Sequence, residues 1–344
     1  MSKKSFVLGA MALGAGVLAW RTYKATHPAW ARGPISADPG RSRPRLPDSL
    51  FEVPEDVIHH SIPSSDGGNI HVVERGEGRP LVLLHGVTLR YDVWAPQLND
   101  LADRYRVIAV DLRGHGESFA GEDGYGLGCL AQDLATTLEA LDLRDAIVVG
   151  HSMGGMTVMH FCGQHRDVLA ERVAGLVFVA TRAHQVLPPF ADRRARLILA
   201  KGQSMLEAGR PLPTATTSTR NIARLAFGEN PSPRAVDAIA EMGDAMEPEA
   251  MLASAAGLMD HDSRAALRET NTPSLVVAGT RDILTPVPSA SHLAHILPNS
   301  EFVVLARAGH QIMQERPAEL AELIDEFAAH LPEIKSTDSS ATTS

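Results

Sequence analysis

The sequence predicts an α/β fold, with a mostly parallel sheet flanked by helices and a helical insertion near its middle. Short runs rich in Val, Ile and Leu alternate with amphipathic stretches, which is typical of strand–helix repeats. The runs lack alternating polar residues, which indicates strands covered on both faces. Between residues 182 and 272 no strand-like run occurs, while apolar residues recur at helical spacing.

The composition is that of a globular protein and excludes several classes. The 344 residues are 44% hydrophobic and 21% charged, which fits one large domain or two ordinary ones. Two cysteines are too few for a disulfide framework or a four-thiolate zinc site. The net charge of −9, without a basic stripe in the body of the chain, argues against a nucleic-acid partner.

No cofactor or metal ion is expected. The sequence contains neither a dinucleotide-binding fingerprint nor a P-loop. The histidine pairs His59/His60 and His292/His295 have no convincing third metal ligand. Any chemistry is therefore expected to come from side chains and backbone amides.

Residues 1–24 are predicted to be a membrane anchor or a signal segment. The run from Phe6 to Trp20 has no polar side chain and has basic residues on both sides. As a helix it would span about 22 Å, short of the roughly 30 Å hydrocarbon core. We expect membrane association through residues 6–20 as an uncleaved anchor. The alternatives are a cleaved signal with secretion, or a helix packed on a cytoplasmic domain.

The remaining chain divides by composition. Residues 25–54, rich in Pro and Arg, are expected to form a tether. An α/β core is expected at 55–181 and 273–332, a helical cap at 182–272, and a disordered polar tail at 333–344. We find no internal repeat.

The strands and helices follow in order along this core. Val57–Ile62 and Asn69–Val73 flank Ser-Ser-Asp-Gly-Gly, which is a hairpin signal. Further strands are predicted at Leu81–Leu84, Tyr105–Val110, Ala146–Val149, Val173–Val179, Ser274–Ala278 and Phe302–Leu305. Helices are predicted at Tyr91–Ala102, Leu127–Leu141, Met153–Gln164 and Ala318–Ala329.

Ser152 is the candidate nucleophile. It is central in Gly150-His151-Ser152-Met153-Gly154, a Gly-x-Ser-x-Gly sequence between a predicted strand and a predicted helix. A sharp turn at this place strains the serine backbone and needs glycines beside it, because a Cβ would strike the neighbouring chain. The alternative is a glycine-rich turn with an incidental serine.

The amides of Val87 and Met153 are the candidate oxyanion donors. His85-Gly86-Val87 ends an earlier strand, so the Val87 amide can point toward a developing alkoxide beside Ser152. Met153 follows the serine at the start of a helix, where backbone amides favour negative charge. The alternative for His85-Gly86 is an ordinary strand-to-loop turn.

His310 is the candidate base and Asp282 its orienting acid. His310 follows the last predicted strand and Asp282 the one before it, so both are expected at the carboxyl edge of the sheet, where such sheets bind ligands. A carboxylate there would fix the imidazole tautomer and stabilise the imidazolium. The alternatives are a helix-capping aspartate and a surface-loop histidine.

Other residues near these positions are expected to have structural roles. Ser118 lacks the strand–turn–helix setting of a nucleophile, and its segment is interpreted as a turn that shapes the pocket. Arg113 in the same segment is expected to be a structural charge partner. His85 and His151 are expected to pack or to brace loops.

Together these motifs resemble the α/β-hydrolase superfamily, and in particular serine esterases and lipases with a helical cap. The resemblance covers about residues 55–332 and rests on His85-Gly86, the segment from Asp111 to Ser118, the turn around Ser152, Asp282 and His310. It implies an eight-stranded, mostly parallel sheet with a helical cap after the sixth strand, which residues 182–272 fit. It also implies the triad order Ser152, Asp282, His310.

The resemblance implies an enzyme that hydrolyses carboxylic esters through an acyl-enzyme. Haloalkane dehalogenases and epoxide hydrolases of this superfamily use Asp as the nucleophile, whereas this chain has Ser. We expect a small-molecule ester as substrate, with a hydrophobic acyl group because the cap is rich in apolar residues. A cofactor-free haloperoxidase (perhydrolase), a carbon–carbon bond hydrolase and a non-catalytic ligand-binding homologue remain alternatives. The sequence contains no signal for an oligomeric state.

Overall fold

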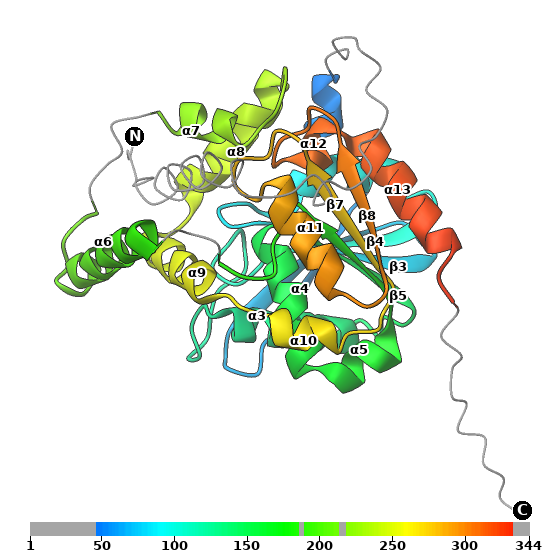
Figure 1. Cartoon of the computed structure of the whole chain (residues 1–344), viewed down its shortest axis with the longest axis horizontal. Coiled ribbons are helices and arrows are strands. Elements are labelled where there is room, and N and C mark those ends of the chain that lie inside the picture. Colours follow the sequence, from blue (N-terminus) through cyan, green and yellow to red (C-terminus); the bar gives the residue numbers. More distant parts are fainter. Residues whose placement is uncertain (1–45, 186–188, 213–217, 333–344) are drawn as a thin grey trace, which may run out of the picture.

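One sheet of eight strands organises the molecule, in the order β1-β2-β4-β3-β5-β6-β7-β8 (Figure 1). This computed structural model describes residues 46–185, 189–212 and 218–332. β2 pairs antiparallel with β1 and β4, and the pairs from β4 through β8 are parallel. The strands are β1 (Ile58–Pro63), β2 (Asn69–Arg75), β3 (Arg79–Leu84), β4 (Tyr105–Val110), β5 (Ala146–His151), β6 (Val173–Val179), β7 (Ser274–Gly279) and β8 (Ser300–Leu305).

Both faces of the central sheet are covered by helices. In β3, Val82 and Leu84 belong to one apolar cluster, and Leu81 and Leu83 belong to another. The first cluster contains side chains of α3, α4 and α11, and the second contains side chains of α2 and α13. The covering elements are η2 (Asp48–Phe51), η3 (Tyr91–Trp94), α2 (Ala95–Asp100), α3 (Leu127–Ala140), α4 (Met153–Gln164), α5 (Arg166–Arg172), α11 (Val287–Ile296), α12 (Ile312–Glu315) and α13 (Pro317–Ala329).

A helical insertion lies between β6 and β7. It comprises α6 (Pro189–Glu207), α7 (Thr219–Leu225), α8 (Pro233–Ala245), α9 (Pro248–Asp260) and α10 (Arg264–Arg268). Helices α6 to α9 are grouped to one side of the sheet in Figure 1. Ile222, Met246 and Met251 pack together, with Ile283 and Leu284 of the loop after β7 against them. The insertion therefore rests on the loop that carries Asp282.

The apolar residues of the insertion do not form one continuous lining. Phe227 joins the cluster on one face of the sheet. By contrast, Phe190, Leu197 and Leu225 are 63%, 64% and 50% exposed. The proposal that apolar residues of the insertion contact a substrate therefore applies only to those that are not exposed to solvent. Leu187, another apolar residue of this region, lies outside the described residues.

The predicted fold class is confirmed, including eight strands and helices inserted after the sixth. The eight predicted strands are all present, and β4, β6 and α4 have the predicted bounds. The stretch Tyr91–Ala102, predicted as one helix, is a 3₁₀ turn followed by α2, because Pro96 fits best in the first turn of a helix. Two short helices, α5 and α12, were not predicted.

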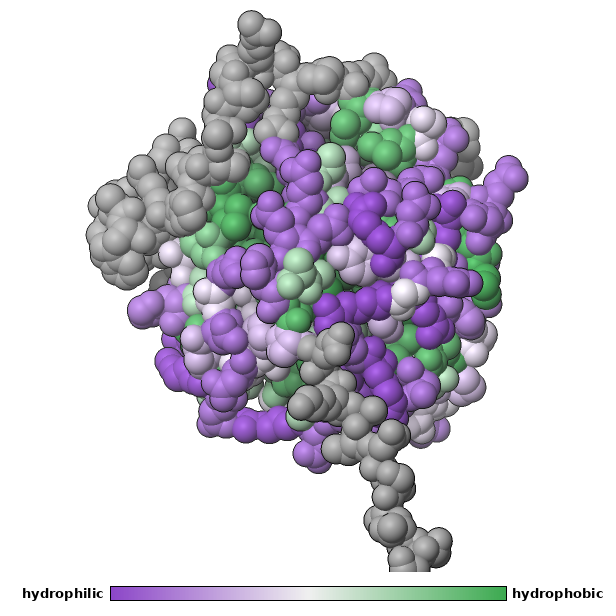
Figure 2. Space-filling model, turned by 90° about the vertical axis from the view of Figure 1, so that its right-hand side faces the viewer, coloured by the Kyte–Doolittle hydropathy of each residue, from purple (hydrophilic) through white to green (hydrophobic). Residues whose placement is uncertain are grey.

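The predicted terminal segments lie outside the described residues. These are the anchor or signal at 1–24, most of the tether at 25–54, and nearly all of the tail at 333–344. Among the helices of the described part, none is long and apolar enough to cross a membrane. On the face shown in Figure 2, hydrophilic residues predominate and hydrophobic residues form separate patches.

Candidate active site

Ser152 occupies a strained turn between β5 and α4. Its backbone has φ 52° and ψ −113°, a conformation that non-glycine residues rarely adopt. The Ser152 amide donates to the carbonyl of Val179 at 3.0 Å, and its carbonyl accepts the Thr181 hydroxyl at 2.7 Å. Bonds to the end of β6 thus hold the turn, with the serine at the first turn of α4.

Glycines beside Ser152 are required by close packing. A Cβ on Gly150 would lie 2.6 Å from the Cα of Gly155, and a Cβ on Gly154 would lie 2.4 Å from the carbonyl oxygen of Leu84. Both distances are far below van der Waals contact, and both neighbours are backbone atoms. The steric reason predicted for the Gly-x-Ser-x-Gly sequence is therefore present at this turn.

The loop after β3 passes close to the serine. A Cβ on Gly86 would lie 3.1 Å from the Cβ of Ser152, so Val87 begins directly beside the candidate nucleophile. His85 is fully buried, and its Nε2 accepts the amide of Leu112 at 3.0 Å. Its Nδ1 therefore carries the proton and donates to the carbonyl of Gly86 at 2.7 Å. His85 braces the loop, as expected.

Asp282 lies in the loop after β7 and is almost completely buried. Its Oδ1 accepts the amides of Leu284 and Thr285 at 2.8 and 2.9 Å. Its Oδ2 accepts the Thr285 hydroxyl at 2.6 Å and His310 Nδ1 at 2.9 Å. Burial alone would raise the pKa of Asp282, but His310 and the Thr285 hydrogen bonds outweigh it and lower that pKa. The carboxylate is therefore ionised at neutral pH.

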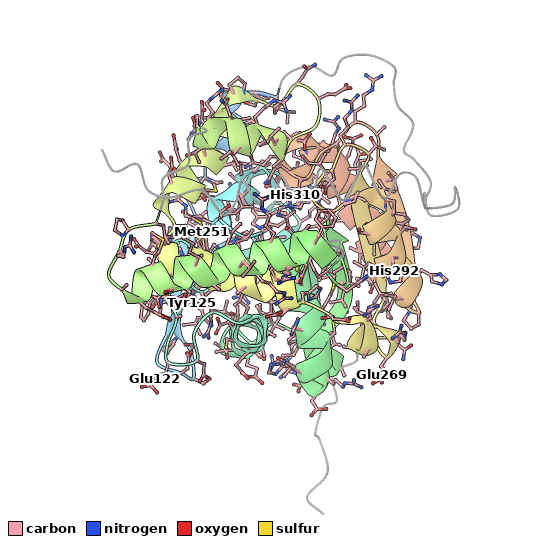
Figure 3. The ribbon with its side chains drawn as sticks, turned by 60° about the vertical axis from the view of Figure 1, so that its left-hand side comes forward. Glu122, Tyr125, Met251, Glu269, His292 and His310 are labelled. Carbon is pink, nitrogen blue, oxygen red and sulfur yellow. The ribbon has the colours of Figure 1, made fainter. Side chains whose placement is uncertain are left out.

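His310 is fixed by both its ring and its backbone. It is 5% exposed, and its ring is held at Nδ1 by Asp282. Its amide donates to the carbonyl of Ala226, in the insertion, at 2.7 Å. Its carbonyl accepts Nε2 of His151 at 3.0 Å. Figure 3 shows His310 well apart from His292 and Glu269, which lie at the periphery.

His151 joins the candidate base to the candidate nucleophile, because it directly precedes Ser152 in the chain. Its ring centroid lies 4.8 Å from that of His310. Burial lowers the pKa of His151 well below its usual value, so the ring is neutral and donates through Nε2. Among the described residues, His310 Nδ1 is hydrogen-bonded to Asp282, and no hydrogen bond joins the Ser152 hydroxyl to His310. Such catalytic bonds are often long before a substrate binds.

Two supporting residues were not predicted from the sequence. The Thr285 hydroxyl donates to Asp282 and lies 3.2 Å from His310 Nδ1. Thr285 is three residues after Asp282, the spacing of a capping turn, and this spacing was the sequence signal that could have identified it. Glu315, on α12, accepts the amides of Gly309 at 3.0 Å and of Gly228 at 2.8 Å. Burial raises the pKa of Glu315 to about 7.

The other reactive-looking residues have structural partners. The Ser118 hydroxyl donates to the carbonyl of Asp111 at 2.6 Å and accepts the His71 amide at 2.8 Å. Arg113 is buried and forms ion pairs with Asp133 at 2.6 Å and Asp66 at 2.7 Å. Within the described ranges, no group of three or more His, Cys, Asp or Glu residues is arranged to hold a metal ion.

Comparison with known proteins identifies the family to which this chain belongs. The profile of the family described as alpha/beta hydrolase fold matches residues 79–317, which is more than half of the chain. The chain therefore belongs to the α/β-hydrolase family.

Individual relatives span nearly the same region. The chain is 27% identical over 270 residues to the AB hydrolase superfamily protein YisY of Bacillus subtilis, covering 78% of this chain and 98% of that protein. It is 31% identical over 264 residues to the non-heme chloroperoxidase CPO-A1 of Kitasatospora aureofaciens, covering 72% and 90%. A thermophilic esterase from Thermogutta terrifontis superposes with a TM-score of 0.68 at 27% identity, covering 79% of this chain and 98% of that one.

Proposed function

We propose that this hydrolase cleaves carboxylic esters through the triad Ser152, His310 and Asp282. The observation that carries the proposal is the buried, ionised Asp282 bound to His310 Nδ1 at 2.9 Å, with His310 tied through His151 to the strained Ser152 turn. A carboxylate in this position keeps the other ring nitrogen, Nε2, free to accept a proton. The similarity to a solved esterase supports the same reaction class.

The mechanism follows from the proposed roles. Ser152 Oγ attacks the ester carbonyl carbon while His310 Nε2 takes its proton, and the amides of Val87 and Met153 stabilise the oxyanion. The tetrahedral intermediate collapses, and His310 protonates the leaving alcohol. Water then gives a proton to His310 and attacks the acyl carbon, which releases the acid and restores Ser152.

The proposed substrate is a small ester with an apolar acyl chain. This preference is supported by the apolar side chains that the insertion contributes near the loop of Asp282, such as Met251 and Met246. We also propose that the protein associates with a membrane through residues 6–20, on the basis of their uninterrupted apolar sequence.

A fluorophosphonate probe and an ester panel test the proposal. The full-length protein is expected to be labelled at Ser152 and to hydrolyse p-nitrophenyl esters, with rates that depend on acyl length. Ser152→Ala is expected to lose labelling and at least about 10³-fold of kcat. No labelling of the wild-type protein would favour a non-catalytic homologue. Labelling without turnover of any ester would overturn ester hydrolysis.

Perhydrolysis is the second candidate, and the 31% identity to a non-heme chloroperoxidase favours it. In this reaction hydrogen peroxide, rather than water, attacks the acyl carbon of the acyl-enzyme and releases a peracid and regenerated Ser152. Peracid formation from acetate and hydrogen peroxide, absent in Ser152→Ala, would support it. Ester turnover without peracid formation would exclude it.

A further inference from the structure

Arg182 lies at the same edge of the sheet as the triad. β5, β6 and β7 are neighbouring parallel strands, and residues beyond their carboxyl ends include Ser152, Arg182 and Asp282 respectively. Thr181, the residue before Arg182, donates its hydroxyl to the Ser152 carbonyl at 2.7 Å. Arg182 therefore directly follows the residue that holds the serine turn, in the segment after β6, and β6 lies between β5 and β7 in the sheet.

The guanidinium of Arg182 has no protein partner in the part of the chain that the structure describes. Its Nε is buried and without a hydrogen-bond partner, and no ion pair involves its side chain. The residue as a whole keeps intermediate exposure, so atoms other than Nε remain accessible. A buried N–H without an acceptor is costly, and an anion bound at the accessible side of the guanidinium would supply that acceptor.

The groups around Arg182 leave its charge uncompensated. The one carboxylate that acts on it electrostatically is Asp282, which is already bound to His310 and Thr285. His261, which donates to the Arg182 carbonyl at 2.9 Å, has its pKa lowered to about 4 by burial and is neutral at pH 7. Burial lowers the pKa of Arg182 only to about 10, so the guanidinium stays charged.

We propose that Arg182 binds a free carboxylate of the substrate, so that the ester cleaved at Ser152 carries a negative charge at the far end of its acyl chain. A guanidinium matches a carboxylate through two parallel N–H···O bonds, which gives orientation as well as affinity. The inference rests on the proposed ester hydrolysis and narrows its substrate class. An acyl chain that is apolar along its length and ends in a carboxylate could contact the apolar side chains of the insertion and also pair with the Arg182 guanidinium.

Two matched esters test the proposal, monomethyl glutarate and methyl pentanoate. Their acyl chains are equal in length and differ in a terminal carboxylate or methyl group. The wild-type protein is expected to prefer monomethyl glutarate in kcat/KM. Arg182→Met is expected to lower the ratio of the two kcat/KM values by about 10- to 100-fold, and Arg182→Lys by less.

Arg264→Met is the matched control. Arg264 also lies near His184, but its side chain is 42% exposed and paired with Asp262 at 2.6 Å. Its substitution removes one positive charge from the same region, and the ratio is expected to change by less than about twofold. If Arg182→Met lowers kcat/KM equally for both esters, Arg182 acts through Asp282 or through the fold, and the proposal is overturned.

Protection by dicarboxylates gives a readout that does not depend on turnover. Succinate, glutarate or adipate is expected to slow fluorophosphonate labelling of Ser152 in the wild-type protein and not in Arg182→Met. Labelling that no dicarboxylate slows, together with an unchanged ester ratio, would reject the role of Arg182 while leaving ester hydrolysis intact. If Ser152 is not labelled at all, ester hydrolysis fails. Arg182 is then judged by a glutarate-induced rise in Tm that Arg182→Met lacks.

Discussion

Asp282 combines two roles at the scale of single residues. One carboxylate oxygen caps the loop through the amides of Leu284 and Thr285, and the other holds His310. The sequence left a helix-capping aspartate and a triad acid as alternatives, and the geometry contains both sets of hydrogen bonds. A substitution that alters the hydrogen bond to His310 and keeps those to the loop amides therefore separates the two roles of Asp282.

Asp282→Asn is expected to keep the fold and to lose activity. The amide oxygen can still accept the loop amides, whereas the amide NH₂ facing His310 Nδ1 favours the wrong ring tautomer. We expect kcat on p-nitrophenyl butyrate to fall by about 10⁴-fold, with Tm within a few degrees of wild type. A loss of less than about tenfold, measured on a folded protein, would contradict the role of Asp282 as the triad acid.

Glu315 predicts a dependence of stability on pH. Its pKa is raised from 4.5 to about 7 because the carboxyl is buried, although two backbone amides and Arg316 favour its charged form. The native state therefore keeps this proton at pH values where the unfolded chain has lost it. The contribution of Glu315 protonation to the free energy of unfolding is therefore complete below about pH 4.5 and is lost as the pH rises through 7.

Glu315→Gln removes this titration and allows it to be measured. Between about pH 4.5 and 8, the unfolding free energy of wild type should fall relative to Glu315→Gln by about 3 kcal/mol. Urea unfolding at several pH values checks this, and the difference between the two proteins cancels the titration of the buried histidines. Parallel pH profiles would show that the Glu315 pKa is not raised.

At the scale of elements, the turn between β5 and α4 depends on backbone contact with β3. A Cβ on Gly154 would lie 2.4 Å from the carbonyl of Leu84, whereas a Cβ on Gly257, in α9, would meet only Leu127 Cγ at 3.8 Å. Gly154→Ala is therefore expected to cost about 3 kcal/mol or more and to abolish labelling. Gly257→Ala, the control, is expected to stabilise α9 by about 0.5–1 kcal/mol. Unfolding curves of both variants test the contrast.

The strands were predictable because they are short, uninterrupted apolar runs, such as Val173–Val179. The helix α12 was not, because four residues, Ile312–Glu315, are too few to show a helical period. Glu315 was missed with it. The contacts of Glu315 join residues far apart in the chain, and only the fold reveals such neighbours.

At the scale of the whole molecule, the candidate triad could be predicted from chain order and strand ends. Ser152, Asp282 and His310 each follow a predicted strand, and parallel strands bring such positions to one edge. The bond from His151 to His310 and the unpartnered Arg182 were not predictable, since both depend on packing between distant segments.

Removal of residues 1–24 tests the proposed membrane association. The full chain is expected to sediment with membranes, because the Phe6–Trp20 run favours an apolar environment, and the shortened chain to remain in the supernatant. Its kcat/KM on p-nitrophenyl butyrate should stay within about twofold of the full chain. Equal partitioning of the two proteins would contradict the proposal.

The hydrogen bonds between His310 and the insertion also constrain protein engineering. The His310 and Gln311 amides share the Ala226 carbonyl, and Glu315 bridges Gly228 and Gly309. A chimaera that receives a homologue's insertion would thus alter the hydrogen bonds that support His310, the proposed general base, along with its selectivity. Grafts that retain residues 226–229 should preserve turnover, while exchanges confined to α6 and α9 retune substrate choice.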